Sequence, residues 1–224
     1  MPTQRLAVRL LVASALMSSS TLVAASPSSA ADTWTTTVVA LPSATAVDFG
    51  QAIEIEADVD SQSGFAPTNG TSTLLARPAT STTWRAVATS SSPLTGFSDV
   101  KPRMNTEYKV AYSGYEAGSA QEDSYEPSES SAFTIEVART ISYPDGGFEL
   151  KGRVKPKYGK KKIVVRVSKE QNAGYVKFKT IKTDRRGRYS LTLPRRKGTW
   201  YWSLSVRGDE RYLPTSFRWK TWVS

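Results

Sequence analysis

Lysine and arginine are the residues whose number and spacing in this sequence could support a binding chemistry. They gather in three stretches of the second half, Lys155–Lys162, Lys177–Arg188 and Arg195–Lys197. In the middle stretch Lys177 and Lys179 alternate with other residue types, which predicts one cationic face on a β-strand. Long cationic side chains on a sheet face can contact a polyanion at several points, and such binding weakens steeply with salt. The pattern therefore predicts electrostatic binding.

The candidate site residues come from these stretches and from the aromatic residues near the end of the chain. The candidates for polyanion binding are Lys160, Lys161, Lys162, Lys177, Lys179, Arg185, Arg186, Arg195, Arg196 and Lys197. Tyr201 and Trp222 lie on the opposite strand parity from Trp202 and Trp219, which are expected to face a core. Tyr201 and Trp222 are therefore candidates for an exposed aromatic patch that could stack on sugar rings or bases. The alternative is a solvated, highly charged surface without a partner.

The composition excludes several catalytic and metal-binding chemistries. The chain has no Cys and no His, so disulfides, thiolate or imidazole metal sites, and Cys-His or Ser-His catalytic pairs cannot form. A small secreted hydrolase built on paired carboxylates or a Ser-Lys dyad is an alternative, but nothing in the sequence singles out such a pair. We expect a protein that is not an enzyme and that needs no cofactor.

Four carboxylates alternate along one predicted strand, Ala52–Asp60. They could contribute oxygen ligands to Ca²⁺. Alternate residues on a strand lie about 6–7 Å apart, however, which is too far for a single ion without ligands from a loop. We therefore favour a solvated sheet face, whose like charges also discourage edge pairing.

The net charge of +10 hides opposite charges in the two halves of the chain. Residues 32–140 contain 6 Lys and Arg against 14 Asp and Glu, whereas residues 141–224 contain 22 against 6. This asymmetry predicts an anionic partner for the basic half, either a polymer or the acidic half of another copy. In an exported protein the polymer would be wall teichoic acid, peptidoglycan or an acidic phospholipid surface rather than nucleic acid.

Residues 1–30 have the pattern of a secretory signal peptide. Arg5 and Arg9 precede a short apolar run, Leu10–Met17, and small residues at Ser28–Ala30 suit a cleavage site. The apolar run is too short to span a bilayer. The chain offers no apolar C-terminal anchor and no Cys for lipidation. We expect a secreted protein without a transmembrane anchor, either released or held at the cell surface.

Period-two alternation predicts short strands throughout the remaining sequence, with turn residues between them. The predicted strands of the first half are 34–41, 52–60, 72–77, 84–89, 108–112 and 133–137, with Phe97 as a possible further start. Those of the second half are 148–154, 163–167, 175–182, 189–193, 202–206 and 216–222, and a type I turn is expected at Asp184–Gly187. Segments of the two halves match at offsets of 91, 94 and 95 residues. The chain therefore contains an internal repeat.

This pattern predicts two tandem antiparallel β-sandwiches. Val100-Lys-Pro102 followed by Thr106-Glu-Tyr108-Lys-Val110 resembles the tyrosine-corner segment of immunoglobulin-like and fibronectin type III-like domains. Thr183-Asp184 with Gly187-Arg-Tyr189, and Leu193-Pro194 with Gly198-Thr199-Trp200, are similar to tandem Ig-like modules of secreted actinobacterial proteins. The resemblance implies a sandwich fold and an extracellular setting, and it implies no active site. The expected domains are an acidic Ig-like sandwich at 31–138 and a basic one at 139–224.

The predicted function is that of a non-enzymatic binding or structural protein of the cell envelope, whose basic domain contacts an anionic wall polymer. The alternative is a protein–protein interaction module in which the acidic domain of one copy meets the basic domain of another. No small-molecule cofactor is expected in either case.

Overall fold

The structure, a computed structural model, describes residues 31–224, and the predicted signal peptide at 1–30 lies outside the described residues. All the secondary-structure elements assigned within the described range are β-strands. The all-β class predicted from the period-two patterns is therefore confirmed.

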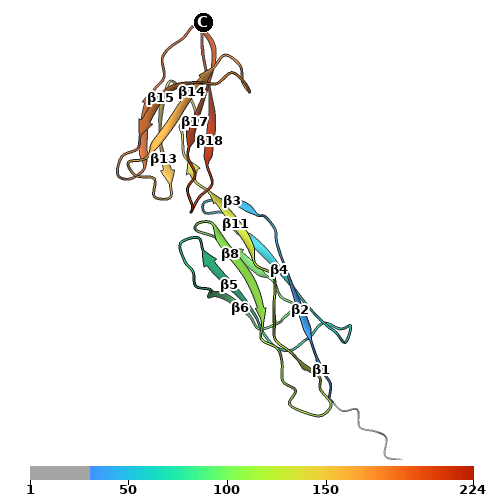
Figure 1. The fold of residues 1–224 in the computed structure, drawn as a ribbon. Helices are drawn as coiled ribbons and strands as arrows, with labels where there is room; N and C mark the ends of the chain where they lie inside the picture. The colour runs from blue at the N-terminus through green and yellow to red at the C-terminus, as the bar shows by residue number, and fades with distance from the viewer. Residues whose placement is uncertain (1–30) are drawn as a thin grey trace, which may run out of the picture.

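The N-terminal half folds into a β-sandwich (Figure 1). One sheet has the order β2–β4–β7, and the other has the order β3–β11–β8–β5–β6 with β10 added beside β8. A separate pair joins β1 to β9. The strands are β1 (Thr33–Trp34), β2 (Thr36–Pro42), β3 (Ala46–Asp48), β4 (Ile53–Ser61), β5 (Ser72–Pro78), β6 (Arg85–Ser90), β7 (Phe97–Val100), β8 (Thr106–Tyr112), β9 (Ser124–Tyr125), β10 (Ser128–Glu129) and β11 (Phe133–Ala138).

The C-terminal half forms a second sandwich from seven strands. Its smaller sheet has the order β12–β13–β16, and its larger sheet has the order β15–β14–β17–β18. The strands are β12 (Thr140–Ile141), β13 (Glu149–Lys155), β14 (Lys162–Ser168), β15 (Val176–Lys182), β16 (Arg188–Thr192), β17 (Gly198–Val206) and β18 (Thr215–Val223). Three strands facing four in this order is an immunoglobulin-like arrangement.

The internal repeat corresponds to strands that occupy equivalent positions. The segments matched at an offset of 95 residues are β4 and β13, each the central strand of a three-stranded sheet. Those matched at 94 residues are β8 and β17, which are inner strands of the larger sheets. Those matched at 91 residues are β6 and β15, which are edge strands of the same sheets. The repeated sequence pattern therefore specifies a repeated strand topology.

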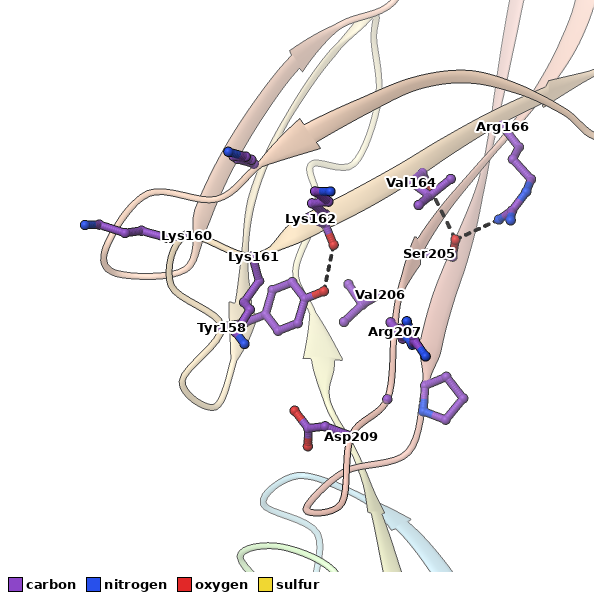
Figure 2. A pocket seen from close by; sticks show the side chains of 13 residues that line it. Tyr158, Lys160, Lys161, Lys162, Val164, Arg166, Ser205, Val206, Arg207 and Asp209 are labelled. Atoms are coloured by element: carbon purple, nitrogen blue, oxygen red, sulfur yellow. Dashed lines mark hydrogen bonds between the residues drawn. The ribbon is translucent and has the colours of Figure 1, made fainter.

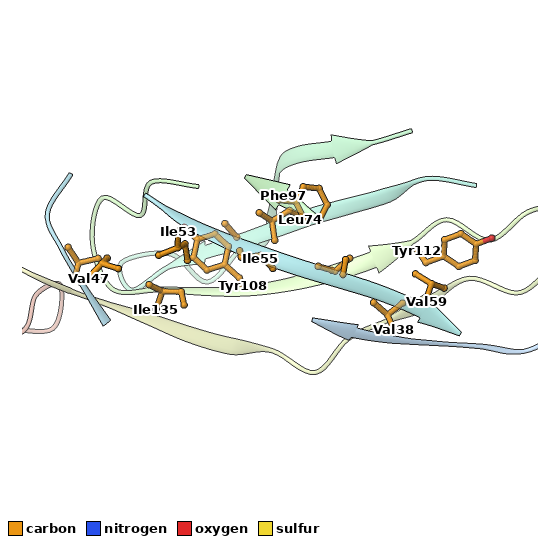
Figure 3. Packing of buried hydrophobic residues seen from close by; sticks show 14 of the residues in the cluster. Val38, Val47, Ile53, Ile55, Val59, Leu74, Phe97, Tyr108, Tyr112 and Ile135 are labelled. Carbon is orange, nitrogen blue, oxygen red and sulfur yellow. The ribbon is translucent and has the colours of Figure 1, made fainter. Parts of the chain in front are cut away.

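Strand alternation decides which side chains reach the two hydrophobic cores. On β4 the apolar residues are buried and the carboxylates between them are exposed. The N-terminal core joins side chains from both sheets, with Ile55, Leu74 and Ile135 almost fully buried (Figure 3). On β17 Trp202 and Leu204 are fully buried in a separate C-terminal core. The predicted inward position of Trp202 is therefore confirmed.

The turn between β17 and β18 contacts the N-terminal sandwich. Tyr212, in this turn, is 5% exposed and is part of the N-terminal core. Its hydroxyl donates a hydrogen bond to the carbonyl oxygen of Arg103 at 3.0 Å, and the N–H of Leu213 donates to the carbonyl oxygen of Val137 at 2.8 Å. The resemblance to a tyrosine corner pointed to Tyr108, but the tyrosine that bonds to the loop before β8 comes from the other sandwich. These contacts join the two halves through a specific interface.

Arg139, between β11 and β12, occupies the centre of this joint. Its side chain is 4% exposed and forms an ion pair with Asp209 at 2.6 Å. The guanidinium lies 5.1 Å from the ring centroid of Tyr158 and 4.2 Å from that of Tyr212, and its Nε donates to the carbonyl oxygen of Pro156 at 3.3 Å. A buried cation requires such partners because desolvation opposes its charged form. The joint is therefore held by one charge placed between aromatic rings from the C-terminal sandwich.

Replacing Tyr212 with phenylalanine tests the polar part of the joint. The Tyr212→Phe variant keeps the buried ring and loses the hydrogen bond to Arg103. We expect the free energy of unfolding to fall by about 1 kcal/mol, the usual net contribution of one such bond. Thermal unfolding followed by circular dichroism measures the change. The control is Tyr143→Phe, which alters an exposed tyrosine and should leave the midpoint unchanged; equal shifts for both variants would contradict the assignment.

Candidate polyanion-binding site

The larger sheet of the C-terminal sandwich carries an excess of positive charge. Three of its four strands, β14, β15 and β18, carry seven Lys and Arg residues, and no strand of the sheet carries Asp or Glu. The seven are Lys162, Arg166, Lys177, Lys179, Lys182, Arg218 and Lys220, and all are exposed. None of them forms an ion pair among the described residues. The ion pairs in this sandwich are formed by Arg139 and Lys151 instead. The sheet therefore presents positive charge that the described part of the chain does not neutralise.

Strand register places these cations beside one another. Lys162 on β14 lies opposite Lys182 on β15, and Arg166 lies opposite Lys177. A β-bulge between Val165 and Arg166 interrupts this pairing. Directly opposed residues on antiparallel strands have side chains only about 5 Å apart, so each like-charged pair repels itself in the absence of an anion. Of the predicted Lys177 and Lys179 face, the register therefore aligns Lys177 with the outward cations of β14, whereas the bulge places Lys179 opposite the buried Val165.

An open pocket of about 780 Å³ lies where this sheet meets the joint (Figure 2). Its walls combine cationic side chains with a few apolar ones. They comprise Tyr158, Lys160, Lys161, Lys162, Val164, Arg166, Lys182, Ser205, Val206, Arg207, Gly208, Asp209 and Pro214. Figure 2 shows Lys160 extending away from Tyr158, while Lys161 lies beside the tyrosine ring. The Tyr158 hydroxyl donates to the carbonyl oxygen of Lys162 at 2.6 Å and fixes the loop between them.

The loop that carries Lys160–Lys162 lies against the turn around Arg185. The N–H of Lys160 donates to the carbonyl oxygen of Asp184 at 3.0 Å. A Cβ atom on Gly159 would lie 2.4 Å from the carbonyl oxygen of Arg185, so only glycine permits this close approach. The first basic cluster and the Arg185 turn at the end of the second one are therefore brought together at one end of the sandwich.

The third cluster lies at the other end of the sandwich. The loop before β17 carries Arg195, Arg196 and Lys197. The pocket lies at the opposite end of β17, beside Ser205 and Val206. The Arg196 guanidinium is 4.6 Å from the ring centroid of Trp200, and that of Arg195 is 5.1 Å from the ring of Phe148. Cation–π contacts of this kind are attractive, and in each of them one face of the guanidinium lies against an aromatic ring. The structure thus does not bring this cluster to the pocket, and two of its members cover aromatic residues.

The two candidate aromatic residues share the outward face of β17 and β18. Tyr201 lies opposite Lys220, and Trp222 is the next outward residue on β18. Trp222 is 64% exposed, whereas Tyr201 is half-buried. The exposed aromatic patch predicted from the sequence therefore consists of Trp222 and only part of Tyr201, next to cations from β18.

Five cations of the basic surface were not among the candidates chosen from the sequence. They are Arg166, Lys182, Arg207, Arg218 and Lys220. The residues of β14 alternate between buried apolar and outward positions, and this parity alone could have identified Arg166. The position of Arg207 beside the basic loop depends on the pairing of β14 with β17, which no local pattern specifies.

Two carboxylates near the basic clusters remain ionised at neutral pH. Burial raises the pKa of Asp209, but the hydrogen bond and charge of Arg139 outweigh it and hold the pKa below its ordinary value of 3.8. At the turn, the N–H groups of Arg188 and Arg186 donate to Asp184, and they hold the pKa of that carboxyl below the same value. Each carboxylate therefore stabilises the backbone or the joint.

Comparisons with known proteins identify no family. No protein-family model matches the chain, and no curated protein matches it. Solved structures with some similarity include the human OSCAR ligand-binding domain, at 15% identity and a TM-score of 0.26, covering 81% of this chain and 95% of that one. A marsupial T cell receptor has 9% identity and a TM-score of 0.32, with the same coverage of 81% and 95%. The chicken CNTN1 FN1–FN3 domains have 14% identity and a TM-score of 0.27, covering 74% and 60%.

These TM-scores are too low to support an argument about family or function. The assignment of the fold rests on the strand order instead. Within residues 31–224 the structure contains no helix of sufficient length and apolar character to span a membrane.

Proposed function

We propose that this is a secreted, non-enzymatic binding protein of the cell envelope, whose basic C-terminal sandwich contacts an anionic wall polymer. The observation that carries the proposal is the four-stranded sheet with seven cations and no carboxylate. Secretion is inferred from the signal-peptide pattern of residues 1–30. A polymer of repeating phosphates or carboxylates suits this surface because it can neutralise several cations at once.

The mechanism of binding is multipoint ion pairing on a prearranged surface. Cations on neighbouring strands lie about 5 Å apart and those along one strand about 6–7 Å apart, so adjacent anionic groups of a polymer can each find a partner. Binding releases the counterions held by the polymer, and the affinity therefore falls as the salt concentration rises. Exposed Trp222, beside the cations, offers an apolar surface for a sugar or polyol backbone.

Charge reversal on the sheet tests the proposal. The variant combines Lys162→Glu, Arg166→Glu and Lys177→Glu, which are exposed and form no ion pair among the described residues. A basic residue near an anionic surface contributes about 1 kcal/mol, so three lost contacts should weaken binding to purified cell walls about 100-fold at low salt. A sedimentation assay across a salt series measures this, and the salt dependence should also become shallower.

The matched control reverses three exposed cations on the opposite sheet, Lys151→Glu, Lys155→Glu and Arg188→Glu. It makes the same change in net charge, so a much smaller loss of affinity would locate binding on the larger sheet. Equal losses for the two triple variants would contradict a specific face, and failure of the unaltered protein to sediment with walls at low salt would refute the proposed function.

A further inference from the structure

A second unpartnered surface lies on the N-terminal sandwich and differs in kind from the basic sheet. On the outward face of β2, Val39 is 46% exposed and Leu41 is 59% exposed. In register beside them on β4 lie Asp58, opposite Val39, and Glu56, opposite Leu41. Aliphatic and acidic side chains therefore run in two parallel rows. We call Val39, Leu41, Glu56, Asp58 and Leu94 the acidic–apolar face.

This face is hollowed into a groove of about 400 Å³, lined by the five residues together with Ala57 and Gly96. Leu94 forms the far wall and is 46% exposed. Gly96 lies against the backbone of β4, since a Cβ atom there would lie 2.6 Å from the carbonyl oxygen of Ile55. Only glycine permits this close approach, so this wall of the groove is formed by backbone.

A solvated acidic surface accounts for the carboxylates but not for the aliphatic residues. Glu56 and Asp58 form no ion pair among the described residues. Exposed aliphatic residues that gather around one groove, rimmed by charge, are typical of interaction sites. The partner that fits must bring an apolar group for the groove and cations for the two carboxylates.

The end of the C-terminal sandwich at which β17 begins and β18 finishes carries an apolar group together with cations. Trp222 is 64% exposed, and Lys220 lies opposite Tyr201 on the same outward face as Arg218. An aromatic side chain beside cations is complementary to aliphatic side chains beside carboxylates. The opposite net charges of the two halves of the chain reinforce the match.

The two complementary surfaces cannot meet within one molecule. β18 begins at the joint and ends, with Trp222, at the end of the C-terminal sandwich that points away from the N-terminal one (Figure 1). A contact between these two surfaces therefore requires two copies of the chain. We propose that the acidic–apolar face of one copy binds the Trp222 end of a second copy. Because two different surfaces meet, the contact is heterologous, and it generates closed assemblies or open head-to-tail chains depending on the rotation between copies.

Charge exchange between two variants tests this contact. The first variant carries Glu56→Lys and Asp58→Lys, and the second carries Arg218→Glu and Lys220→Glu. In sedimentation velocity at low salt, the unaltered protein should associate as its concentration rises, and salt should reverse the association. Each variant alone should stay monomeric because its two complementary surfaces now carry the same charge.

An equal mixture of the two variants should associate again, because every contact between them pairs opposite charges. A Trp222→Ala variant should associate at least about tenfold more weakly if the ring fills the groove, which corresponds to about 1.4 kcal/mol. A protein that stays monomeric at low salt, or variants whose mixture stays monomeric, would overturn the proposal. Sedimentation velocity is carried out without cell walls, so a failure of self-association is distinguishable from a failure of wall binding even though Arg218, Lys220 and Trp222 belong to both surfaces.

Discussion

The Trp202→Ala variant is expected to lose about 3–5 kcal/mol of its free energy of unfolding, the usual loss when a large buried aromatic side chain is removed. Trp202 is fully buried, and its Nε1 donates a hydrogen bond to the Thr221 hydroxyl at 2.9 Å. Phe178 packs edge-on against its indole at 5.2 Å between ring centroids. The mutation therefore creates a cavity between the two sheets and leaves a buried hydroxyl without its donor.

The measurement is chemical denaturation followed by circular dichroism. Trp222→Ala is the matched control, since it removes the same side chain from a position that is 64% exposed, and it should change the stability by less than about 0.5 kcal/mol. Trp202→Phe should fall between the two because it keeps the aromatic ring and loses the bond to Thr221. Equal destabilisation by the two alanine variants would mean that Trp202 does not organise this core.

The alternation of residues along the strands was sufficient to predict most of the fold. On a strand the side chains point to opposite faces in turn, so parity fixes which residues are buried once one of them is placed. This holds for Trp202 on β17, which was predicted to face inwards and is buried, and Leu204, of the same parity, is buried with it. It also explains why the repeat offsets identified equivalent strands, since a shift of one residue would have turned each apolar set outwards.

Contacts between residues far apart in the sequence could not be predicted in the same way. Tyr212 lies 109 residues from Arg103, to which its hydroxyl donates, and nothing in its local sequence distinguishes it from a residue of its own core. The same holds for Arg139, whose partner Asp209 is 70 residues away. Both residues lie between strands, where parity assigns no inward or outward position and does not show against which sandwich a side chain packs.

The sequence predicted that the candidate site is positively charged, but it predicted only partly which cations lie next to one another. Runs of lysine such as Lys160–Lys162 are visible in the sequence because they are contiguous. The opposition of Arg166 to Lys177 depends on the register of two strands and on a bulge. The cation–π contact of Arg196 with Trp200 depends on the path of a loop. Composition therefore located the basic domain, whereas the pairing of strands decides which of its cations form one surface.

Removing the carboxylate of the joint should be the second most damaging change. The Asp209→Ala variant leaves the buried guanidinium of Arg139 with the Pro156 carbonyl oxygen and two aromatic rings, but without a counterion. Breaking a buried ion pair in this way costs about 3–5 kcal/mol. Because the Asp209 side chain is 44% exposed, solvent already screens the pair, and we expect a loss of about 2–3 kcal/mol.

Thermal unfolding measures this loss, and small-angle scattering should show a wider range of distances between the two sandwiches. Glu210→Ala is the control, because Glu210 is the adjacent exposed carboxylate and forms no ion pair among the described residues. The double variant Arg139→Met with Asp209→Ala should recover part of the stability, since it removes the uncompensated charge and keeps a side chain of similar length. A double variant less stable than Asp209→Ala would show that the buried charge is not what destabilises the joint.

The pH dependence of the same variant has a defined sign. The pKa of Asp209 is lower in the folded protein than its ordinary value of 3.8, so the unfolded chain binds the proton more readily and protonation favours unfolding. The stabilisation by the pair is fully present above that ordinary value and is lost as the pH falls through the lowered pKa. The difference in stability between the unaltered protein and Asp209→Ala should therefore be constant near neutral pH and shrink on acidification. A difference that grows as the pH falls would contradict an ionised Asp209 as the partner of Arg139.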